Sequence, residues 1–321
     1  MKVLVTGSEG SLMQEVIPLL MQKGHTVIGI DNFARYGEIE RERAYKFIRG
    51  DLTDPEFVDK VVRDVDAVMQ AAALIYGVGG FNKYPADILS KDINLHQNIM
   101  HAMLRNGIKK MVYISSSMVY ERCVKQPSAE ADVDESLIPS TDYGLSKLVG
   151  ERITRAFHRQ YDIGYTIWRP FNIITPHEVG ESDLGSSHVF ADYIKNIVKE
   201  QRSEIPIIGD GEQIRCFTWI GDVARGIADF SFDERAANET FNLGNPEPIT
   251  MKALAAIIYD GAKAKNLIGG NGNGLSFKTE KSFPDDVRIR IPDVSKAREI
   301  LGWEPTLKVS ESVERCLDLM K

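Results

Sequence analysis

The chain of 321 residues, 43% hydrophobic and 26% charged, is long enough for one large α/β domain and a smaller lobe. Its net charge of −7 argues against a nucleic-acid partner, because such proteins usually carry a basic surplus. No apolar run reaches the length of a membrane span or suggests a signal peptide, so we expect no membrane partner. The cysteines Cys123, Cys216 and Cys316 have no metal-ligand or redox spacing, so we expect no metal site and a reducing, cytoplasmic location.

The first 31 residues predict a nucleotide-binding unit. An apolar strand pattern at 2–6 leads into a turn with Gly7 and Gly10, then a helical pattern to about Lys23 and a second strand that ends at Asp31. Glycines in such a turn let the backbone approach a pyrophosphate at the helix N-terminus. An acid about twenty residues after the turn binds both ribose hydroxyls and repels a 2′-phosphate. We therefore predict NAD as the coenzyme in preference to NADP.

Strand and helix patterns then alternate as far as residue 172. This alternation predicts an α/β fold of the Rossmann type, a doubly wound parallel sheet covered on both faces by helices. Further strands are expected before Gly50 and at 67–73, 110–114 and 165–168, with long helices at 87–106 and 143–161. Ligands bind beyond the carboxyl ends of such strands. We expect one crevice to collect the residues that follow strands, namely Gly7, Asp31, Ala72, Ser116 and Asn172.

Tyr143 and Lys147 form the candidate catalytic pair. Residues four apart on a helix share one face, and an ammonium beside a phenol stabilises the phenolate and lowers the Tyr pKa. Such a Tyr can act as a general base towards an alcohol. The spacing is weak evidence alone, since a surface Tyr–Lys pair has the same pattern. The nucleotide-binding start and the Ser115–Ser117 cluster add weight to the catalytic interpretation.

After residue 172 the loops lengthen, and Gly and Pro become more frequent. The stretch from Gly269 to Gly274 follows no strand and opens no helix, so we expect a mobile loop there. The charged run from Glu38 to Arg43 is expected to be a solvated helix face.

These patterns together resemble the extended short-chain dehydrogenase/reductase family, in its branch of NAD-dependent nucleotide-sugar epimerases and dehydratases. The resemblance covers nearly the whole chain and is strongest to the UDP-glucose 4-epimerases, with local similarity to GDP-fucose synthases and GDP-mannose 3,5-epimerases. Each motif is modest alone, but their order and spacing argue against chance. They are Thr6-Gly7-x-x-Gly10, Gly50-Asp51-Leu52, Ala71-Ala72, Ser115 to Tyr120, Tyr143-x-x-x-Lys147, Arg169 to Asn172, Gly209 to Arg215, Asp293 to Ala297 and Leu301 to Pro305.

The resemblance assigns roles to individual residues. Ser116 would hold the substrate hydroxyl, Tyr143 would be the base and Lys147 its partner. The coenzyme would contact Gly7, Gly10, Ser11, Leu12, Asp31, Asn32, Asp51, Leu52, Ala71, Ala72, Asn94, Ser115, Tyr143, Lys147, Pro170 and Asn172. The substrate, a nucleoside-diphosphate sugar, would contact Ser116, Ser117, Asn172, His188, Val189, Arg215 and Arg288 or Arg290.

The resemblance also implies two lobes and a dimer. An NAD-binding domain of residues 1–172 and 217–245 would face a nucleotide-sugar lobe of residues 173–216 and 246–321. In that lobe arginines grip the diphosphate, which suits their forked geometry. Loops at about 74–90 and 176–208 would form the base and sugar pockets. The helices at 87–106 and 143–161 would pair with a second copy as a four-helix bundle.

The chain departs from the family pattern at a few positions. Met13 replaces the third glycine of the turn, which affects helix packing and coenzyme affinity. Gln70 stands where a His is usual, and Cys216 where an Asp is common. Ile173-Ile174-Thr175 replaces the usual aliphatic-Tyr-Gly. None of these changes removes a catalytic group.

The resemblance points to a simple 4-epimerase. Dehydratases of the family carry an Asp-Glu pair where this chain has Ser117 and Met118, and the 3,5-epimerases carry a Cys at the position of Met118. A 4-epimerase needs neither, because its 4-keto sugar turns over and takes the hydride back on its other face. His188 keeps a second possibility open, since it matches the second acid/base of an epimerase-reductase or could serve a dehydratase. A non-catalytic, NAD-binding regulatory protein is a third.

Overall fold

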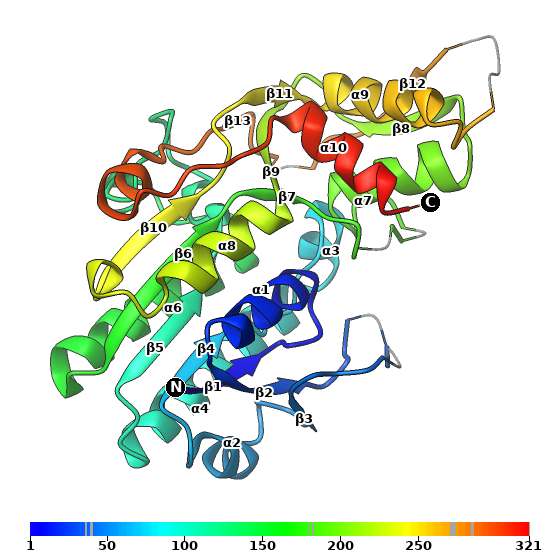
Figure 1. Cartoon of the computed structure of the whole chain (residues 1–321). Helices are drawn as coiled ribbons and strands as arrows, with labels where there is room; N and C mark the ends of the chain where they lie inside the picture. Colours follow the sequence, from blue (N-terminus) through cyan, green and yellow to red (C-terminus); the bar gives the residue numbers. More distant parts are fainter. Residues whose placement is uncertain are drawn as a thin grey trace.

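The computed structural model describes residues 1–35, 37–38, 41–178, 180–181, 183–269, 274–283 and 286–320. Its main sheet has seven parallel strands in the order β10-β6-β5-β4-β1-β2-β3 (Figure 1). The strands are β1 (Lys2–Thr6), β2 (Thr26–Asp31), β3 (Lys46–Arg49), β4 (Ala67–Gln70), β5 (Lys110–Ile114), β6 (Gly164–Pro170) and β10 (Glu239–Leu243). The α/β Rossmann-type fold expected from the sequence is confirmed.

Helices cover both faces of this sheet. On one face α1 (Ser11–Gln22) packs against α8 (Ile220–Phe230), and on the other α4 (Pro85–Arg105) lies between α2 (Pro55–Val62) and α6 (Asp142–Tyr161) (Figure 1). Alternate strand residues point to opposite faces, so Val3 and Val5 join the core under α1 and α8, whereas Leu4 joins the core under α4. Burial on both faces explains the continuous apolar strand sequences.

The C-terminal half adds two smaller sheets. In one, β9 (Ile214–Trp219) pairs with β7 (Asn172–Ile174), β11 (Pro248–Thr250) and β13 (Ile289–Arg290); the other pairs β8 (Glu204–Ile208) with β12 (Ser276–Glu280). Residues of β8 and β9 share an apolar core with α7 (Val189–Tyr193), α9 (Met251–Ala264) and α10 (Val309–Asp318). The shorter helices are α3 (Val78–Lys83), α5 (Asp132–Glu135), η1 (Ser117–Tyr120), η2 (Ile194–Lys199), η3 (Glu234–Ala236) and η4 (Ala297–Leu301).

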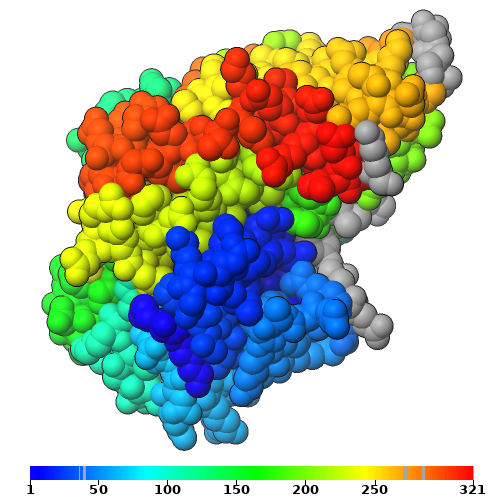
Figure 2. Space-filling model, viewed as in Figure 1, coloured from blue at the N-terminus to red at the C-terminus, as the bar shows by residue number. Residues whose placement is uncertain are grey.

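The main sheet and the two smaller sheets lie at different ends of the molecule (Figure 1). Figure 2 shows the N-terminal residues in blue at one end and the C-terminal residues in orange and red covering the other. In the described part of the chain, no helix is long and apolar enough to cross a membrane.

The expected helix face in the run from Glu38 to Arg43 is wrong. Residues 37–38 and 41–43 are not helical, and Arg41 and Arg43 instead fold back onto the buried carboxylate of Glu9. Among the described residues of this run, the two arginines therefore pair with a buried acid instead of facing solvent. The loop expected at Gly269–Gly274 falls largely on residues 270–273, which lie outside the described residues.

Candidate active site

The three predicted catalytic residues line one pocket at the carboxyl ends of β5 and β6. Ser116 follows β5, and its Oγ accepts a hydrogen bond from Met118 N (3.2 Å). The hydroxyl of Thr141 caps α6 by accepting from Gly144 N (3.1 Å), which fixes where this helix starts. Tyr143 therefore lies in the first turn and Lys147 one turn later, and both are buried, with 6% and 3% exposure.

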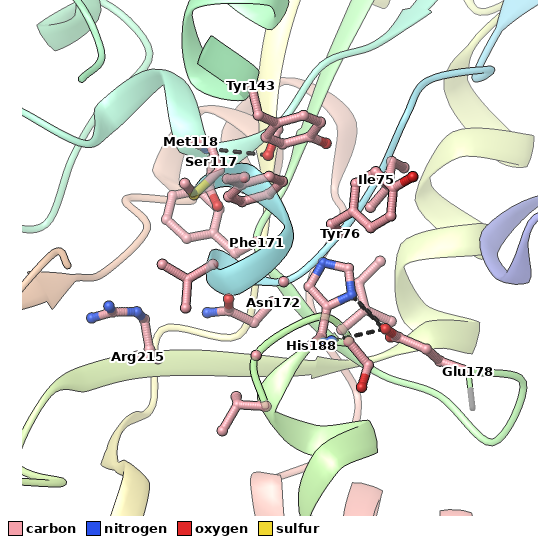
Figure 3. A pocket seen from close by; sticks show the side chains of 18 of the residues that line it. Ile75, Tyr76, Ser117, Met118, Tyr143, Phe171, Asn172, Glu178, His188 and Arg215 are labelled. Carbon is pink, nitrogen blue, oxygen red and sulfur yellow. Dashed lines mark hydrogen bonds and ion pairs between the residues drawn. The ribbon is translucent and has the colours of Figure 1, made fainter. Parts of the chain in front are cut away.

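Aromatic packing fixes the Tyr143 ring. Phe81, from α3, stacks on it with ring centroids 4.6 Å apart and planes 7° apart. Lys147 Nζ lies 5.7 Å from the Tyr143 ring centroid and donates to the carbonyl of Ile114 (3.0 Å). Figure 3 shows Tyr143 and Met118 along one part of the pocket wall, with Arg215 at one side and His188 with Glu178 at the other.

The electrostatics of Tyr143 differ from the expectation. Burial raises the pKa of Tyr143 above its ordinary value and the carboxylate of Asp92 raises it further, while Ser116 and Arg290 oppose the shift. Burial likewise lowers the pKa of Lys147, against the pull of Asp92 and Glu151. The predicted lowering of the Tyr143 pKa by Lys147 is therefore wrong for this structure, because burial of the phenol and the nearby Asp92 carboxylate raise the pKa instead.

A network of buried charges supports the catalytic helix from behind. Glu151, two turns after Tyr143, accepts two hydrogen bonds from Arg169 (2.8 and 2.7 Å) and one from Ser115 Oγ (2.6 Å). Burial disfavours the charged form of Glu151, but Arg169 and Ser115 outweigh it and the pKa is lowered. Asp92, on α4, accepts from Leu74 N (2.9 Å) and Ser146 Oγ (3.3 Å). These contacts fix α6 against β5, β6 and α4.

The glycine turn has the shape that a pyrophosphate requires. Gly7 has φ of +64°, and a Cβ there would lie 2.9 Å from the backbone of Ala72. Gly10 caps α1 without a side-chain hydrogen bond, and the first turn of α1 carries no acid. The N–H groups and the positive end of the helix dipole thus face an anion site with no competing carboxylate in that turn. Met13 is buried in the core at 1% exposure.

Asp31 is held in place by its neighbours. Its carboxylate accepts from Glu9 N (3.0 Å) and Phe33 N (2.8 Å), which leaves lone pairs for ribose hydroxyls. Burial alone would raise the pKa of Glu9, but hydrogen bonds from Arg43, Tyr45 and Arg41 lower it, so the turn keeps a charged, fixed residue next to Asp31. The cleft fits the adenosine half of NAD.

The structure brings together nearly all the residues predicted to bind the coenzyme. Those that line this cleft or the adjoining pocket are Gly7, Gly10, Ser11, Leu12, Asp31, Asn32, Asp51, Leu52, Ala71, Ala72, Ser115, Tyr143, Lys147, Pro170 and Asn172. Asn94 lines neither. It lies on α4 and accepts a hydrogen bond from Asn98 Nδ2 (3.2 Å).

The structure places most, but not all, of the residues predicted to bind substrate in the pocket. Ser116, Ser117, Asn172, His188, Val189, Arg215 and Arg290 line the pocket. Arg215 pairs with Asp286 (3.1 Å), and Arg290 with Asn172 Oδ1 (3.0 Å). Arg288 is not among the lining residues; its exposed side chain pairs with Asp210 (2.7 Å).

His188 forms a close pair with Glu178. The carboxylate of Glu178 lies 2.8 Å from His188 Nδ1 and accepts from the backbone N of His188 (2.9 Å). Burial disfavours a charged imidazole, but the Glu178 carboxylate outweighs it and raises the pKa of His188. The pair lines both the pocket and the coenzyme cleft.

Arg35 connects the cleft to the pocket. Its Nε donates to Ile75 O (2.6 Å) and its Nη2 to Ser186 O (3.1 Å), while the guanidinium lies 4.4 Å from the centroid of the Tyr76 ring and pairs with Glu181. Sequence reasoning missed this residue, and also Tyr76, Phe81, Asp92 and Glu178. The signal available was only the expected pocket loops at 74–90 and 176–208, which contain three of them.

Comparison with known proteins agrees with these features. The pattern of the NAD dependent epimerase/dehydratase family matches residues 3–244. A UDP-glucuronate 4-epimerase from Thermodesulfobacterium geofontis is 28% identical, with 99% of this chain and 95% of that protein covered. UDP-glucuronic acid decarboxylase 6 from Arabidopsis thaliana is 28% identical, with 98% and 87% covered. A crystal structure of UDP-glucose 4-epimerase with UDP-glucose, from Thermotoga maritima, has a TM-score of 0.85 and 26% identity, with 100% and 98% covered.

These matches confirm the family expected from the sequence and the expectation of NAD as its coenzyme. They span epimerases and a decarboxylase, so they settle the class of enzyme rather than the reaction. The chain belongs to the NAD-dependent epimerase/dehydratase family, whose members include nucleotide-sugar enzymes of this architecture.

Proposed function

We propose that this protein is a nucleotide-sugar 4-epimerase that works through a transient 4-keto intermediate. The observation that carries the proposal is the grouping of Ser116, Tyr143 and Lys147 in the pocket that adjoins the coenzyme cleft. Ser117 and Met118, next to them, offer no acid for the elimination of water. Among the reactions of the family, 4-epimerisation needs only one base and a reversible hydride acceptor.

Each residue of the site has a separate role in the proposed reaction. Ser116 holds the sugar hydroxyl, and Tyr143 Oη takes its proton as general base. Lys147 supplies a fixed positive charge beside the reacting groups, and Phe81 keeps the Tyr143 ring in one orientation and excludes water from it. NAD, when bound, supplies the hydride acceptor. On the return half of the cycle Tyr143 gives the proton back, so no group is consumed.

Incubation with a panel of nucleotide sugars tests this proposal. NMR and mass spectrometry should show conversion to the C4 epimer, with no net change in NAD absorbance and no loss of mass. Water loss, CO₂ loss or stoichiometric consumption of reduced coenzyme would each assign a different reaction and overturn the proposal.

The His188–Glu178 pair supports a second candidate, an epimerase-reductase or dehydratase. A carboxylate-oriented imidazole is the usual form of an acid/base group, and this one faces the pocket. For the simple 4-epimerase, His188→Asn should keep turnover within about tenfold. A loss of about 10²-fold or more, the usual worth of a general acid or base, would favour the second candidate, as would solvent deuterium at the carbon next to the ketone or tighter binding of NADP than of NAD.

A non-catalytic NAD-binding regulator is the weakest candidate. Such a protein has no need of Ser116, Tyr143 and Lys147 grouped in one pocket. Retained nicotinamide and nucleotide-sugar binding without any conversion would favour it.

We also propose that the molecule divides into a nucleotide-binding part, residues 1–172 and 217–245, and a sugar-nucleotide part, residues 173–216 and 246–321. The division is supported by the side of the site that each supplies. The catalytic groups come from the first part, and Arg215 and Arg290 come from the second.

A further inference from the structure

Three arginines are buried among the described residues, and one of them has no carboxylate partner. Arg169 makes two hydrogen bonds to Glu151 and others to Tyr120 Oη and Glu130 O. Arg215 pairs with Asp286. Arg290, at 6% exposure, has no such carboxylate partner among the described residues. The first two are ordinary buried ion pairs, whereas the third is a buried cation held by neutral groups.

The contacts of Arg290 are weak for a buried guanidinium. One terminal nitrogen contacts the thioether sulfur of Met118, which is a poor acceptor, and the other donates to Asn172 Oδ1 (3.0 Å). The Nε atom is buried without a hydrogen-bond partner. Glu121 and Asp286 act on Arg290 only through space, and burial lowers its pKa. A buried guanidinium without a carboxylate partner is unfavourable. The surroundings of Arg290 therefore favour the binding of an anionic group of a ligand.

The position of Arg290 indicates which part of a substrate it faces. Met118 and Asn172 follow β5 and β6, directly beside Ser116, and the charge of Arg290 also opposes the rise in the Tyr143 pKa. Arg290 therefore faces the reacting end of the pocket. Arg215 is its register partner on the adjacent parallel strand, but it pairs with Asp286 beside Gln213. The two cations thus serve different parts of one elongated ligand.

We infer that Arg290 binds a carboxylate on the sugar ring, and that the substrate is a nucleoside-diphosphate uronic acid. The inference rests on the proposed nucleotide-sugar chemistry of the same site and adds the class of sugar. Arg290 lines the pocket, and its two terminal nitrogens, held by a thioether and an amide oxygen rather than by a carboxylate, offer the forked donors that match a carboxylate. An acid at position 118 would neutralise Arg290, and Met118 leaves its charge for the ligand. Arg215 remains for the diphosphate.

Paired ligands that differ only at C6 test the assignment. Calorimetry with UDP-glucuronic acid and UDP-glucose, in the presence of NAD, should show at least about tenfold tighter binding of the uronic acid by the wild-type protein. Arg290→Gln should weaken UDP-glucuronic acid about 10- to 100-fold, the range of a lost charge-assisted pair, and should weaken UDP-glucose far less. Arg290→Lys, which keeps the charge but loses the fork, should fall between them.

Arg215→Gln is the matched control, since it removes the buried arginine that is the register partner of Arg290 on the adjacent strand. It should weaken both ligands, and UDP itself, by the same factor. If Arg290→Gln also weakens UDP-glucuronic acid, UDP-glucose and UDP equally, then Arg290 binds the diphosphate and the inference is wrong. Equal binding of the two sugars by the wild-type protein would overturn it as well. Circular dichroism of each variant separates these outcomes from misfolding.

The same experiment distinguishes the inference from the proposed function. The GDP pair, GDP-mannuronic acid and GDP-mannose, is run alongside in case the base is guanine. Tight uronic acid binding followed by release of CO₂ would keep the assignment of Arg290 and overturn the 4-epimerase proposal. Conversion of both neutral and acidic sugars without preference would keep the epimerase and overturn the inference. No binding by any pair would overturn both.

Discussion

Tyr143 carries the proposed chemistry, because hydride cannot leave the sugar carbon unless the hydroxyl proton leaves as well. Tyr143→Phe keeps the ring against Phe81 and removes only the proton-accepting oxygen. We expect conversion to fall by at least about 10²-fold while NAD and nucleotide-sugar binding stay close to wild type, since the loss falls on the transition state. Turnover by NMR and binding by calorimetry measure the two effects. Tyr259→Phe on α9 is a control remote from the site.

Asp92 gives the site a testable pH dependence. Its carboxylate raises the pKa of the buried Tyr143, in addition to the effect of burial. Asp92→Asn removes that charge and keeps an acceptor for Leu74 N. Removing a negative charge favours the phenolate, so the limb of the kcat/KM profile that rises with Tyr143 deprotonation should move to lower pH. A limb that stays in place, or moves to higher pH, would contradict this account.

At the scale of elements, α6 is joined to β6 by the buried pair Glu151 and Arg169. Arg169→Met leaves Glu151 buried without its main partner, and we expect the free energy of unfolding to fall by about 3–5 kcal/mol. In the wild type the lowered pKa of Glu151 means that its contribution is present above about pH 4.5 and is lost on acidification. In the Arg169→Met variant, burial raises the pKa of Glu151 instead. The difference in unfolding free energy between wild type and variant should therefore grow as pH rises from 5 to 8. Urea unfolding at several pH values measures both.

The double variant Glu151→Leu with Arg169→Met is the control for that series. Replacing both members of a buried pair by apolar side chains is often nearly neutral. The double variant should therefore recover much of the lost stability and lose the dependence on pH. A double variant as unstable as Arg169→Met alone would point to packing rather than to charge.

Elements that follow from local sequence were predictable, and contacts between distant loops were not. The glycine turn, Asp31 and the catalytic helix α6 follow from hydrophobic period and glycine position, which act within about twenty residues. The stacking of Phe81 on Tyr143 joins α3 to α6, and the pairing of Glu178 with His188 closes a loop. No hydrophobic periodicity in the sequence signals either contact. The direction of the Tyr143 pKa shift was mispredicted, because it comes from burial in the folded protein and from Asp92 on another helix. Arg288 and Arg290 could not be separated, since their directions depend on the register of β13 on β9.

At the scale of the whole molecule, we propose a homodimer through α4 and α6. These helices carry an aromatic group, with His101 exposed and Phe157 and Tyr161 half-buried, in which His101 meets Phe157 at 5.2 Å and Phe157 meets Tyr161 at 5.4 Å between ring centroids. Phe157→Glu places a charge in that aromatic group, and burying it in a dimer seam is unfavourable. We expect light scattering to show a dimer for the wild type and a monomer for the variant, with Arg63→Glu, at the C-cap of α2, as a control. A dimer in both proteins would place the seam elsewhere.

Arg35 has a consequence for how long the coenzyme stays bound. One side chain spans from the loop after Asp31 to Ile75 and Ser186, and both Arg35 and Ile75 line the cleft, so we expect this link to slow the departure of the coenzyme. A catalyst that returns its coenzyme to the starting redox state each cycle has no need to exchange it, so slow departure does not limit throughput. Arg35→Ala should shorten the residence time of NAD by about tenfold, seen when labelled NAD is chased with unlabelled, while turnover at saturating NAD changes little. Unaltered chase kinetics would mean that the coenzyme is retained by its own contacts with the glycine turn and Asp31.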